Sequence, residues 1–329
     1  VDNSESPAET ERLKKVVDSR TQLMVNPRNT GFGAACNLAF SATDSDYVML
    51  LNPDARTLPK CIPVLTAALQ AHPELGAASP MQWWEPSGRW LLPPAWLPSG
   101  IGMWSLEQAW RLPRWARCLS DTYRRLALQA WTSHDEVVRQ RALSGGAMMV
   151  RRSAALAVGG LFDPAYFMYY EDSDLCLRLR RAGLALALVP GAKAVHEWNH
   201  SPAKVGMMEA SKEIYLTRHF EGRGAWAERL SRCTAQPPRP QPLEYAVLPH
   251  LPETMEVPSA WQGGWLLEVS PSPLLIPAIG QLGRGPSVAL PPSLLARLGP
   301  GPLYLRLGPA HANAPDAKLY VSANAAATG

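Results

Sequence analysis

The stretch from residue 145 to residue 183 reads GGAMMVRRSAALAVGGLFDPAYFMYYEDSDLCLRLRRAG. Its first six residues, GGAMMV, predict a strand that begins in a close-packed turn. Its last part, residues 171–182, has an acidic start and basic later turns, a pattern that suits the dipole of an amphipathic helix. The stretch therefore predicts a strand, a short helix at residues 153–158, and an amphipathic helix that follows an aromatic run.

The same alternation of strand and helix continues on both sides of this stretch. Short apolar runs at residues 46–51, 75–82 and 184–189 predict further strands, and helical patterns lie between them. Strands that alternate with helices form parallel sheets with right-handed crossovers. We therefore predict an α/β domain over residues 1–235, built on a Rossmann-like, mostly parallel sheet.

Two segments depart from this rhythm. Residues 81–135 hold eight of the twelve tryptophans, beside several arginines, and form an insertion. Its aromatic rings could complete a core, form a platform for an acceptor sugar, or lie at a membrane interface. Residues 236–329 begin with a proline-rich linker and continue with short apolar stretches, which predicts a small β-rich, sandwich-like domain.

The bulk composition excludes several classes of protein. The chain of 329 residues is 47% hydrophobic and 18% charged, which is too apolar for a disordered protein. Its net charge of +4 is too small to indicate a nucleic-acid partner. Five scattered cysteines without C-x-x-C spacing argue against a disulfide framework and a zinc site, and favour a reducing compartment. The sequence contains no apolar run long enough to span a bilayer.

The first candidate site lies directly after the predicted strand at 46–51. The tripeptide Asn52-Pro53-Asp54 follows it, and ligands of open α/β sheets bind beyond the carboxyl ends of strands. A carboxylate there can hold Mg²⁺ or Mn²⁺ against a diphosphate, because these cations prefer oxygen ligands. The tripeptide is also an ordinary turn sequence, so alone it is weak support.

The second candidate site opens the predicted helix at 171–182. Glu171, Asp172 and Asp174 place three carboxylates within four residues, which is more than a helix cap requires. This crowding should raise at least one pKa and prepare a carboxylate to accept the proton of a hydroxyl group. Asp174 is expected to pair with Arg178, one helical turn later.

Two weaker signals complete the set. His196 follows the predicted strand at 184–189, and a neutral imidazole can bind a divalent metal. His200 is four residues further on, but the Ser-Pro that follows argues against one helix and therefore against a zinc pair. Residues 29–33 (NTGFG), with Asn37 one turn later, place glycines at a helix start, where backbone N–H groups can approach an anion or a ribose.

Taken together, these motifs resemble the family 2 glycosyltransferases, in particular bacterial rhamnosyltransferase-like members. The resemblance covers about residues 1–220. It implies the GT-A fold of nucleotide-diphospho-sugar transferases, in which a first strand and helix would precede Val1, so we expect an N-terminally incomplete sheet. The matching stretches are VDNS (1–4), NPRNTGFGAACNLAF (26–40), YVMLLNPDA (47–55), the whole of 145–183, and VHEWNHS (195–201).

The resemblance also implies a role for each candidate residue. By position, Asp2 resembles the acid that contacts the base or ribose of the donor. Asp54 resembles the metal-binding acid of the D-x-D element, whose first acid is replaced here by Asn52. Asp172 resembles the catalytic base of an E-D pair, with Glu171 beside it. The other matching positions are Asn29, Gly31 and Asn37 in the donor segment and His196 near the metal and diphosphate.

The implied function is an inverting transfer of a sugar from a nucleotide diphosphate donor to a hydroxyl of a cell-surface glycan or lipid-linked acceptor. The resemblance suggests rhamnose as the sugar, Mg²⁺ or Mn²⁺ as the cofactor, and a cytoplasmic location with peripheral contact to the inner face of the plasma membrane. Two alternatives stay open. One is a catalytically inactive glycan- or nucleotide-binding protein of the same fold, and the other is a nucleotidyltransferase-like enzyme.

Overall fold

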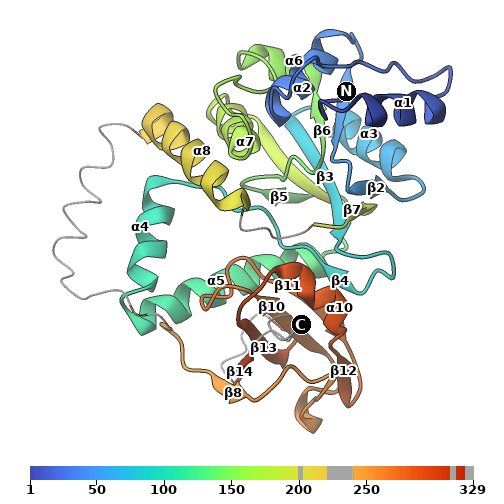
Figure 1. Cartoon of the computed structure of the whole chain (residues 1–329). Helices are drawn as coiled ribbons and strands as arrows, with labels where there is room; N and C mark the ends of the chain where they lie inside the picture. Colours follow the sequence, from blue (N-terminus) through green and yellow to red (C-terminus); the bar gives the residue numbers. More distant parts are fainter. Residues whose placement is uncertain (199–202, 221–238, 240, 312–315, 323–329) are drawn as a thin grey trace.

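The protein has an α/β lobe that contains the N-terminus and a β-rich lobe that contains the C-terminus (Figure 1). Two helices, α4 (Gly100–Ala109) and α5 (Pro113–Thr132), connect them. This computed structural model describes residues 1–198, 203–220, 239, 241–311 and 316–322.

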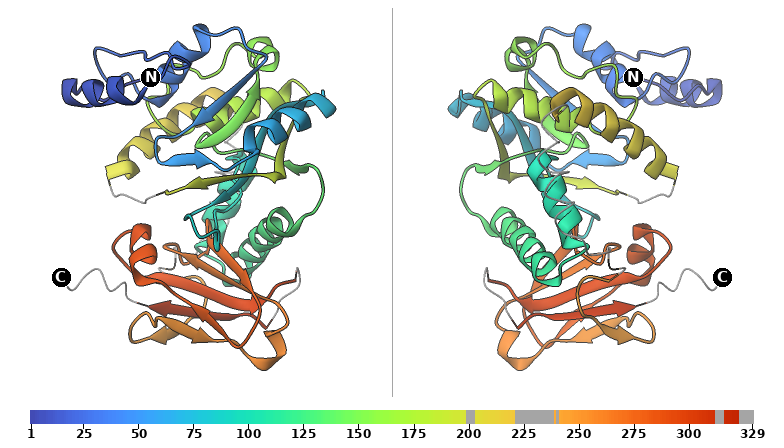
Figure 2. Two further views of the ribbon diagram at one scale, coloured as in Figure 1. Left: turned by 90° about the vertical axis from the view of Figure 1, so that its right-hand side faces the viewer. Right: turned by 90° about the vertical axis from the view of Figure 1, so that its left-hand side faces the viewer.

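The α/β lobe is a sheet with helices on both faces (Figure 2). Helices α2, α6 and α7 pack on one face, and α3 packs on the other. The strands are β1 (Tyr47–Leu51), β2 (Ala55–Thr57), β3 (Leu75–Trp83), β5 (Val138–Gln140), β6 (Ala147–Arg151) and β7 (Ala185–His196). The helices are α1 (Pro7–Val16), α2 (Phe32–Ser41), α3 (Cys61–Ala71), α6 (Arg152–Ala157), α7 (Glu171–Arg181) and α8 (Ala203–Phe220).

The predicted α/β fold class is confirmed, with one difference in strand direction. Strands β3 and β7 are parallel, as expected. Strand β6 lies between β1 and β3 and runs antiparallel to both, so β1, β3 and β7 share one direction. The described sheet is therefore mixed rather than mostly parallel. The reason is that β6 follows the long α4–α5 excursion instead of a short helical crossover, so it can enter the sheet from the opposite end.

Helix α7 forms where the sequence predicted it. Its first turn is acidic and its last turn is basic, and Gly183 after its end adopts a positive φ of 82°. The predicted pair is present, since Arg178 Nε donates to Asp174 Oδ2 at 2.7 Å. The same guanidinium donates to the backbone carbonyls of Val158, Gly160 and Leu161, which fixes α7 against the preceding loop.

The tryptophan-rich insertion joins the two lobes into one sheet. Its short strand β4 (Trp90–Leu91) pairs with β3 on one side and with β11 of the β-rich lobe on the other. Trp84 and Trp90 are buried in the core of the β-rich lobe, so these two rings complete a core. The elements of that lobe are β8 (Ala246–Leu248), β9 (Thr254–Glu256), β10 (Trp265–Ser270), β11 (Ile279–Gly283), β12 (Ser287–Ala289), α10 (Pro292–Leu295), β13 (Leu303–Pro309) and β14 (Lys318–Ser322), with short 3₁₀ turns at Ser259–Trp261 and Ala296–Leu298.

A buried charge network fastens α5 to the β-rich lobe. Glu268 on β10 accepts from Arg306 on β13 at 2.6 and 2.8 Å, and it also pairs with Arg124 on α5. Arg306 extends the network to Asp121 on α5, at 3.0 Å. Burial tends to raise the pKa of Glu268, but the charges of Arg306 and Arg124 outweigh it and hold this pKa below its usual value.

Two predictions fall partly on residues that the structure does not describe. The predicted proline-rich linker begins at residue 236, and residues 236–238 and 240 lie outside the described ranges. The end of the 195–201 motif, including His200, lies outside them as well. Within the part of the chain that is described, no helix is both long enough and apolar enough to cross a membrane.

Candidate active site

Asp54 and His196 are brought together by strand pairing. The Asn52-Pro53-Asp54 turn ends β1 and leads into β2, which runs antiparallel to the end of β7 so that Ala55 lies opposite His196. The backbone N–H of Glu197 donates to the carbonyl of Asp54 at 2.9 Å. As a result, Asp54 Oδ1 lies 3.2 Å from His196 Nε2.

The imidazole of His196 is buried and oriented by its second nitrogen. Nδ1 lies 3.1 Å from Oε1 of Gln82, the penultimate residue of β3. If Nδ1 carries the proton and donates it to Gln82, the lone pair of Nε2 faces Asp54. Nε2 is shielded from solvent and makes no well-aligned hydrogen bond. In that tautomer the arrangement would suit a metal-binding histidine, and this role of His196 stays a prediction.

The residue types at this position fit a divalent cation. Asp54 offers oxygen, and His196 offers nitrogen, at the carboxyl end of the sheet. Among the described residues, no cluster of three or more His, Cys, Asp or Glu could hold a metal ion by itself. A cation held here would therefore need phosphate oxygens of a substrate to complete its coordination, which is how Mg²⁺ is usually bound beside nucleotides.

Gly146 is required for the position of His196. A Cβ at residue 146 would lie 2.3 Å from Cε1 of the imidazole, closer than real Cβ atoms approach other heavy atoms. The carbonyl of Gly146 accepts from the backbone N–H of Asn52 at 3.0 Å, which holds the Asp54 turn against the same loop. Gly146, the second residue of the glycine pair Gly145-Gly146, therefore helps to position both candidate metal ligands.

Asp172 lies on the other side of the same loop. Its Oδ2 accepts from the backbone N–H of Gly145 at 3.0 Å, and its Oδ1 accepts from the N–H of Ser173 at 2.6 Å. Burial raises the pKa of Asp172, although these hydrogen bonds oppose the shift. Asp172 therefore combines a buried carboxyl group and a raised pKa with two hydrogen bonds from backbone N–H groups, an environment that suits a general base.

Glu171 has a different environment. It is buried, and its Oε2 has no hydrogen-bond partner. Burial, and then the charge of Asp172, raise the pKa of Glu171 to about 8. Near neutral pH we therefore expect Glu171 to hold a proton beside the carboxyl group of Asp172.

The backbone before the acidic pair is held in an unusual conformation. Tyr169 and Tyr170 have positive backbone φ angles of 71° and 66°, which residues other than glycine rarely adopt. The hydroxyl of Ser211 on α8 fixes this turn by donating to the carbonyl of Met168 at 2.7 Å. Burial raises the pKa of Tyr169, and the charges of Glu171 and Asp54 raise it further. Carboxylates of both candidate sites, Glu171 and Asp54, thus contribute to the raised pKa of Tyr169.

The donor segment makes close contacts within the chain. The side-chain amide of Asn37 donates to the carbonyl of Phe162 at 2.7 Å and accepts from the backbone N–H of Phe162 at 3.0 Å. Gly31 has a φ of 85°, and a Cβ there would lie 2.1 Å from the carbonyl oxygen of Phe167. That carbonyl accepts the N–H of Phe32 at 2.9 Å, so the first N–H of α2 already has a partner. The glycine turn is explained by packing, and a donor-binding role for Gly31 and Asn37 stays a prediction.

The other predicted donor residues lie close to the N-terminus. Asp2 is buried and accepts hydrogen bonds from Ser4 and Thr10, and these bonds hold its pKa below the usual value. Asn29 accepts from Asn3 at 2.9 Å and from the N–H of Gly31 at 3.0 Å. Both side chains are therefore oriented by neighbours, and contact with a nucleotide stays a prediction for each.

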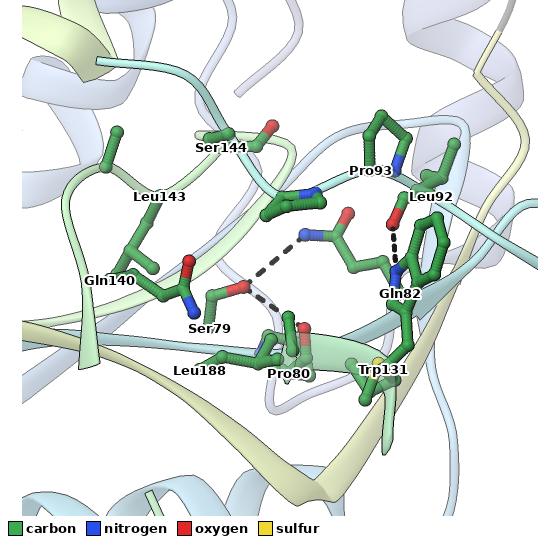
Figure 3. A pocket seen from close by; sticks show the side chains of 15 residues that line it. Ser79, Pro80, Gln82, Leu92, Pro93, Trp131, Gln140, Leu143, Ser144 and Leu188 are labelled. Atoms are coloured by element: carbon green, nitrogen blue, oxygen red, sulfur yellow. Dashed lines mark hydrogen bonds between the residues drawn. The ribbon is translucent and has the colours of Figure 1, made fainter. Parts of the chain in front are cut away.

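A small pocket adjoins the site. It has a volume of about 40 Å³ and runs from Gln82 to Ser144, the residue before the glycine pair. Figure 3 shows Ser79, which lies 3.5 Å from the amide nitrogen of Gln82, and the indole of Trp131, which donates to the carbonyl of Leu92 at 3.0 Å. This space would hold only about two or three water molecules, so it is too small for a sugar.

The sequence analysis missed Gln82 and did not recognise the role of Gly146. Gln82 ends the predicted strand at 75–82, and its place at the carboxyl end of a strand was a usable signal. The role of Gly146 could not be read locally, because its partner His196 is 50 positions away in the chain.

Comparison with known proteins gives this geometry a family. Residues 1–95 match the family model described as glycosyl transferase family 2. This part of the chain is therefore similar to the family 2 glycosyltransferases. The matched residues include Asp2, Asp54 and the donor segment, whereas the acidic pair and His196 lie beyond residue 95.

The chain is also similar to two curated rhamnosyltransferases. N-acetylglucosaminyl-diphospho-decaprenol L-rhamnosyltransferase of Mycobacterium tuberculosis is 33% identical over 203 residues, which cover 56% of this chain and 61% of that protein. Rhamnosyltransferase WbbL of Escherichia coli K12 is 51% identical over 57 residues, or 17% of this chain and 21% of that protein. The chain thus spans less than two thirds of the length of either relative.

A solved structure with some likeness is entitled "Crystal structure of GalNAc-T7 with UDP, GalNAc and Mn2+". It is 14% identical, the match covers 58% of this chain and 35% of that one, and the TM-score is 0.41. This likeness is too low to support an argument about the site. The GT-A assignment rests on the family 2 match and on the observed α/β architecture.

Proposed function

We propose that the protein is an inverting glycosyltransferase that moves a sugar from a nucleotide diphosphate donor to a hydroxyl of a cell-surface or lipid-linked glycan. The single observation that carries this proposal is the arrangement around Gly145 and Gly146. One glycine contacts Asp172, and the next contacts His196, which faces Asp54. A candidate base and a candidate metal site thus lie on either side of one turn.

The metal side of the site would bind the leaving group. Asp54 and His196 would hold Mg²⁺ or Mn²⁺, which when bound would neutralise the charge that develops on the nucleoside diphosphate. Gln82 would keep the imidazole in the tautomer that directs Nε2 toward Asp54. Asn52 would contribute through its backbone, which holds the turn to Gly146.

The other side would activate the acceptor. Asp172 would remove the proton of the acceptor hydroxyl as its oxygen attacks the anomeric carbon from the face opposite the leaving group. One base and one in-line displacement invert the configuration at that carbon, and the transition state would resemble an oxocarbenium ion. Glu171, protonated near neutral pH, would limit the negative charge beside Asp172.

Rhamnose is the donor sugar that the similarity supports, because both curated relatives are named as rhamnosyltransferases. The name of the mycobacterial relative includes a diphospho-decaprenol, a lipid carrier, which supports a lipid-linked acceptor for this chain. An enzyme that uses such an acceptor from the cytoplasm would work at the inner face of the plasma membrane. Its product would enter the polysaccharide of the cell wall or cell surface.

The test is a screen of nucleotide sugars for Mn²⁺-dependent binding and turnover by the full chain. Asp172→Asn should retain donor binding and lose at least about a hundredfold in turnover, the usual contribution of a general base. Asp54→Asn should lose the Mn²⁺ dependence of donor binding. Turnover of Asp172→Asn at the rate of the unmodified chain would contradict the proposal.

The product of the reaction separates this proposal from its rivals. A glycosyltransferase releases a nucleoside diphosphate from the nucleotide sugar when acceptor is added, whereas a nucleotidyltransferase-like enzyme would release pyrophosphate from a nucleoside triphosphate when a sugar phosphate is added. Binding of nucleotide sugar without release of either product, in the presence of acceptor lipid, would favour a catalytically inactive binding protein.

A further inference from the structure

The outer surface of α4 and α5 exposes large apolar side chains. Ile101 on α4 is 62% exposed, and Trp115 and Leu126 on α5 are 40% and 48% exposed. Trp104 lies edge-on to Trp115, with ring centroids 5.5 Å apart. Trp115 and Leu126 are eleven residues apart, which is about three helical turns, so both lie along one stripe of α5. We call these four residues, with the arginines described next, the α4–α5 surface.

Arginines accompany this apolar stripe. Arg114 and Arg125 are exposed, and they too are eleven residues apart, so they form a parallel stripe on the same helix; Arg117 is exposed nearby. The sequence of the two helices contains only two acids, and both are paired. Glu107 binds Arg111 at 3.0 Å, and Asp121 binds Arg306 of the β-rich lobe at 3.0 Å. The exposed charge of the surface is therefore positive.

Two contacts of one side chain link the start of α4 to the turn before the acidic pair. The hydroxyl of Tyr215 on α8 donates to the carbonyl of Pro98, just before α4, at 2.8 Å. The ring of Tyr215 lies 5.4 Å from the ring of Tyr170, the residue before Glu171. Figure 1 shows α8 next to α4. One side chain therefore joins the start of the α4–α5 surface to the turn that positions the candidate base.

We propose that the α4–α5 surface docks on the headgroup layer of an anionic lipid bilayer. Tryptophan and isoleucine that protrude beside arginine have the composition of an interfacial helix, with rings at the headgroup level and guanidinium groups on lipid phosphates. A platform for an acceptor sugar would use the tryptophan rings, but it would give the stripe of arginines no function. The proposal rests on the proposed function and deepens it, because a chain docked in this way would meet its lipid-linked acceptor at the bilayer.

Co-sedimentation of the full chain with vesicles tests this proposal. The chain should sediment with phosphatidylcholine vesicles that contain phosphatidylglycerol, less at high salt, and weakly with phosphatidylcholine alone. The double variant Ile101→Glu with Trp115→Glu should lose binding. Arg114→Gln and Arg117→Gln should each weaken binding about fivefold on anionic vesicles, since each basic side chain near such a surface contributes about this factor.

The matched control is Leu156→Glu, an apolar residue of α6 that is 55% exposed and lies outside the α4–α5 surface. It should bind vesicles as the unmodified chain does, and thermal melts should show that all variants are folded. The proposal is overturned if the unmodified chain stays in the supernatant, if the double variant sediments normally, or if Leu156→Glu loses binding equally.

A second readout separates this proposal from the proposed function. With a water-soluble acceptor, the double variant should release nucleoside diphosphate at the rate of the unmodified chain, because the active site is unchanged. Vesicle binding by a chain that transfers no sugar would support docking and count against glycosyl transfer. Transfer by a chain that never sediments would support the function and overturn the docking surface.

Discussion

At the scale of single residues, the candidate site combines side chains that the sequence could identify with contacts that it could not. Asp54 and His196 could be predicted because each comes close after an apolar run that forms a strand of the sheet. The distance of 3.2 Å between Asp54 Oδ1 and His196 Nε2 depends on the short strand β2. This strand has only three residues, too few to show a recognisable strand pattern in the sequence. Asp172 stood out as one of three clustered carboxylates, but its partner Gly145 is 27 positions away in the chain.

Gly146→Ala tests whether the candidate metal site depends on the close approach of this backbone to His196. The new Cβ would meet the imidazole, so the ring or the loop must shift. We expect a loss of about 1–3 kcal/mol in the free energy of unfolding and at least about a tenfold loss in Mn²⁺ affinity, measured by urea denaturation and by calorimetry.

Gly206→Ala is the matched control, because a Cβ at this position in α8 meets nothing within 4 Å. It should leave stability unchanged or slightly higher. Unaltered Mn²⁺ affinity in Gly146→Ala would contradict the role assigned to His196.

The raised pKa of Glu171 predicts a dependence of stability on pH. The pKa lies at about 8 in the folded protein and near 4.5 in the unfolded chain, so the folded state binds the proton more tightly. The stabilisation is complete below pH 4.5 and is lost as pH rises through 8, by at most about 5 kcal/mol at about 1.4 kcal/mol per pH unit. Glu171→Gln should flatten this slope, as measured by urea denaturation between the two values. An identical slope in the variant would show that another group causes it.

At the scale of elements, strands and helices with clear periodicity were predicted almost to the residue. Helix α7 was expected at 171–182 and spans Glu171–Arg181, because a propensity for helix, an acidic start and a basic end all agree. Strand β7 was expected to end at 189 but continues through Pro190 to His196. Proline and glycine suggested a break, whereas pairing with β2 and β3 extends the strand across an irregularity in register.

Arg178→Ala tests how α7 is fixed. Its guanidinium bonds to Asp174 and to three carbonyls of the loop that precedes the acidic pair. Removal leaves buried acceptors without donors and should cost about 2–4 kcal/mol in unfolding free energy. Arg20→Ala, at an exposed ion pair whose arginine side chain is 88% accessible, should change stability by less than about 0.5 kcal/mol. Equal effects of the two substitutions would count against this role of Arg178.

At the scale of the whole molecule, the sequence predicted two regions but not how they are joined. The β-rich character of residues after 236 followed from short apolar stretches between prolines and glycines. The two-residue strand β4 makes the sheets of both lobes continuous, and such a short element cannot be predicted from local pattern. The pairing of Glu268 with Arg124 also depends on residues 144 positions apart.

Glu268→Gln tests the buried network between α5 and the β-rich lobe. The substitution leaves Arg124 buried without a counter-charge and leaves Arg306 with Asp121, and it should cost about 3–5 kcal/mol in unfolding free energy, measured by urea denaturation. Glu11→Gln, at the exposed pair with Lys14, is the control and should be nearly neutral. A fully stable Glu268→Gln protein would mean that the network does not hold the lobes together.

The central claim is that Asp54, His196 and Asp172 serve one site, with metal and diphosphate on one side of the glycine pair and the acceptor hydroxyl on the other. The most direct measurement is a crystal structure with Mn²⁺ and a nucleoside diphosphate, in which anomalous scattering locates the metal. We predict a manganese ion in contact with Asp54, His196 and the diphosphate, and an open space between the diphosphate and Asp172. Manganese bound elsewhere, or a diphosphate separated from Asp172 by protein, would contradict the account.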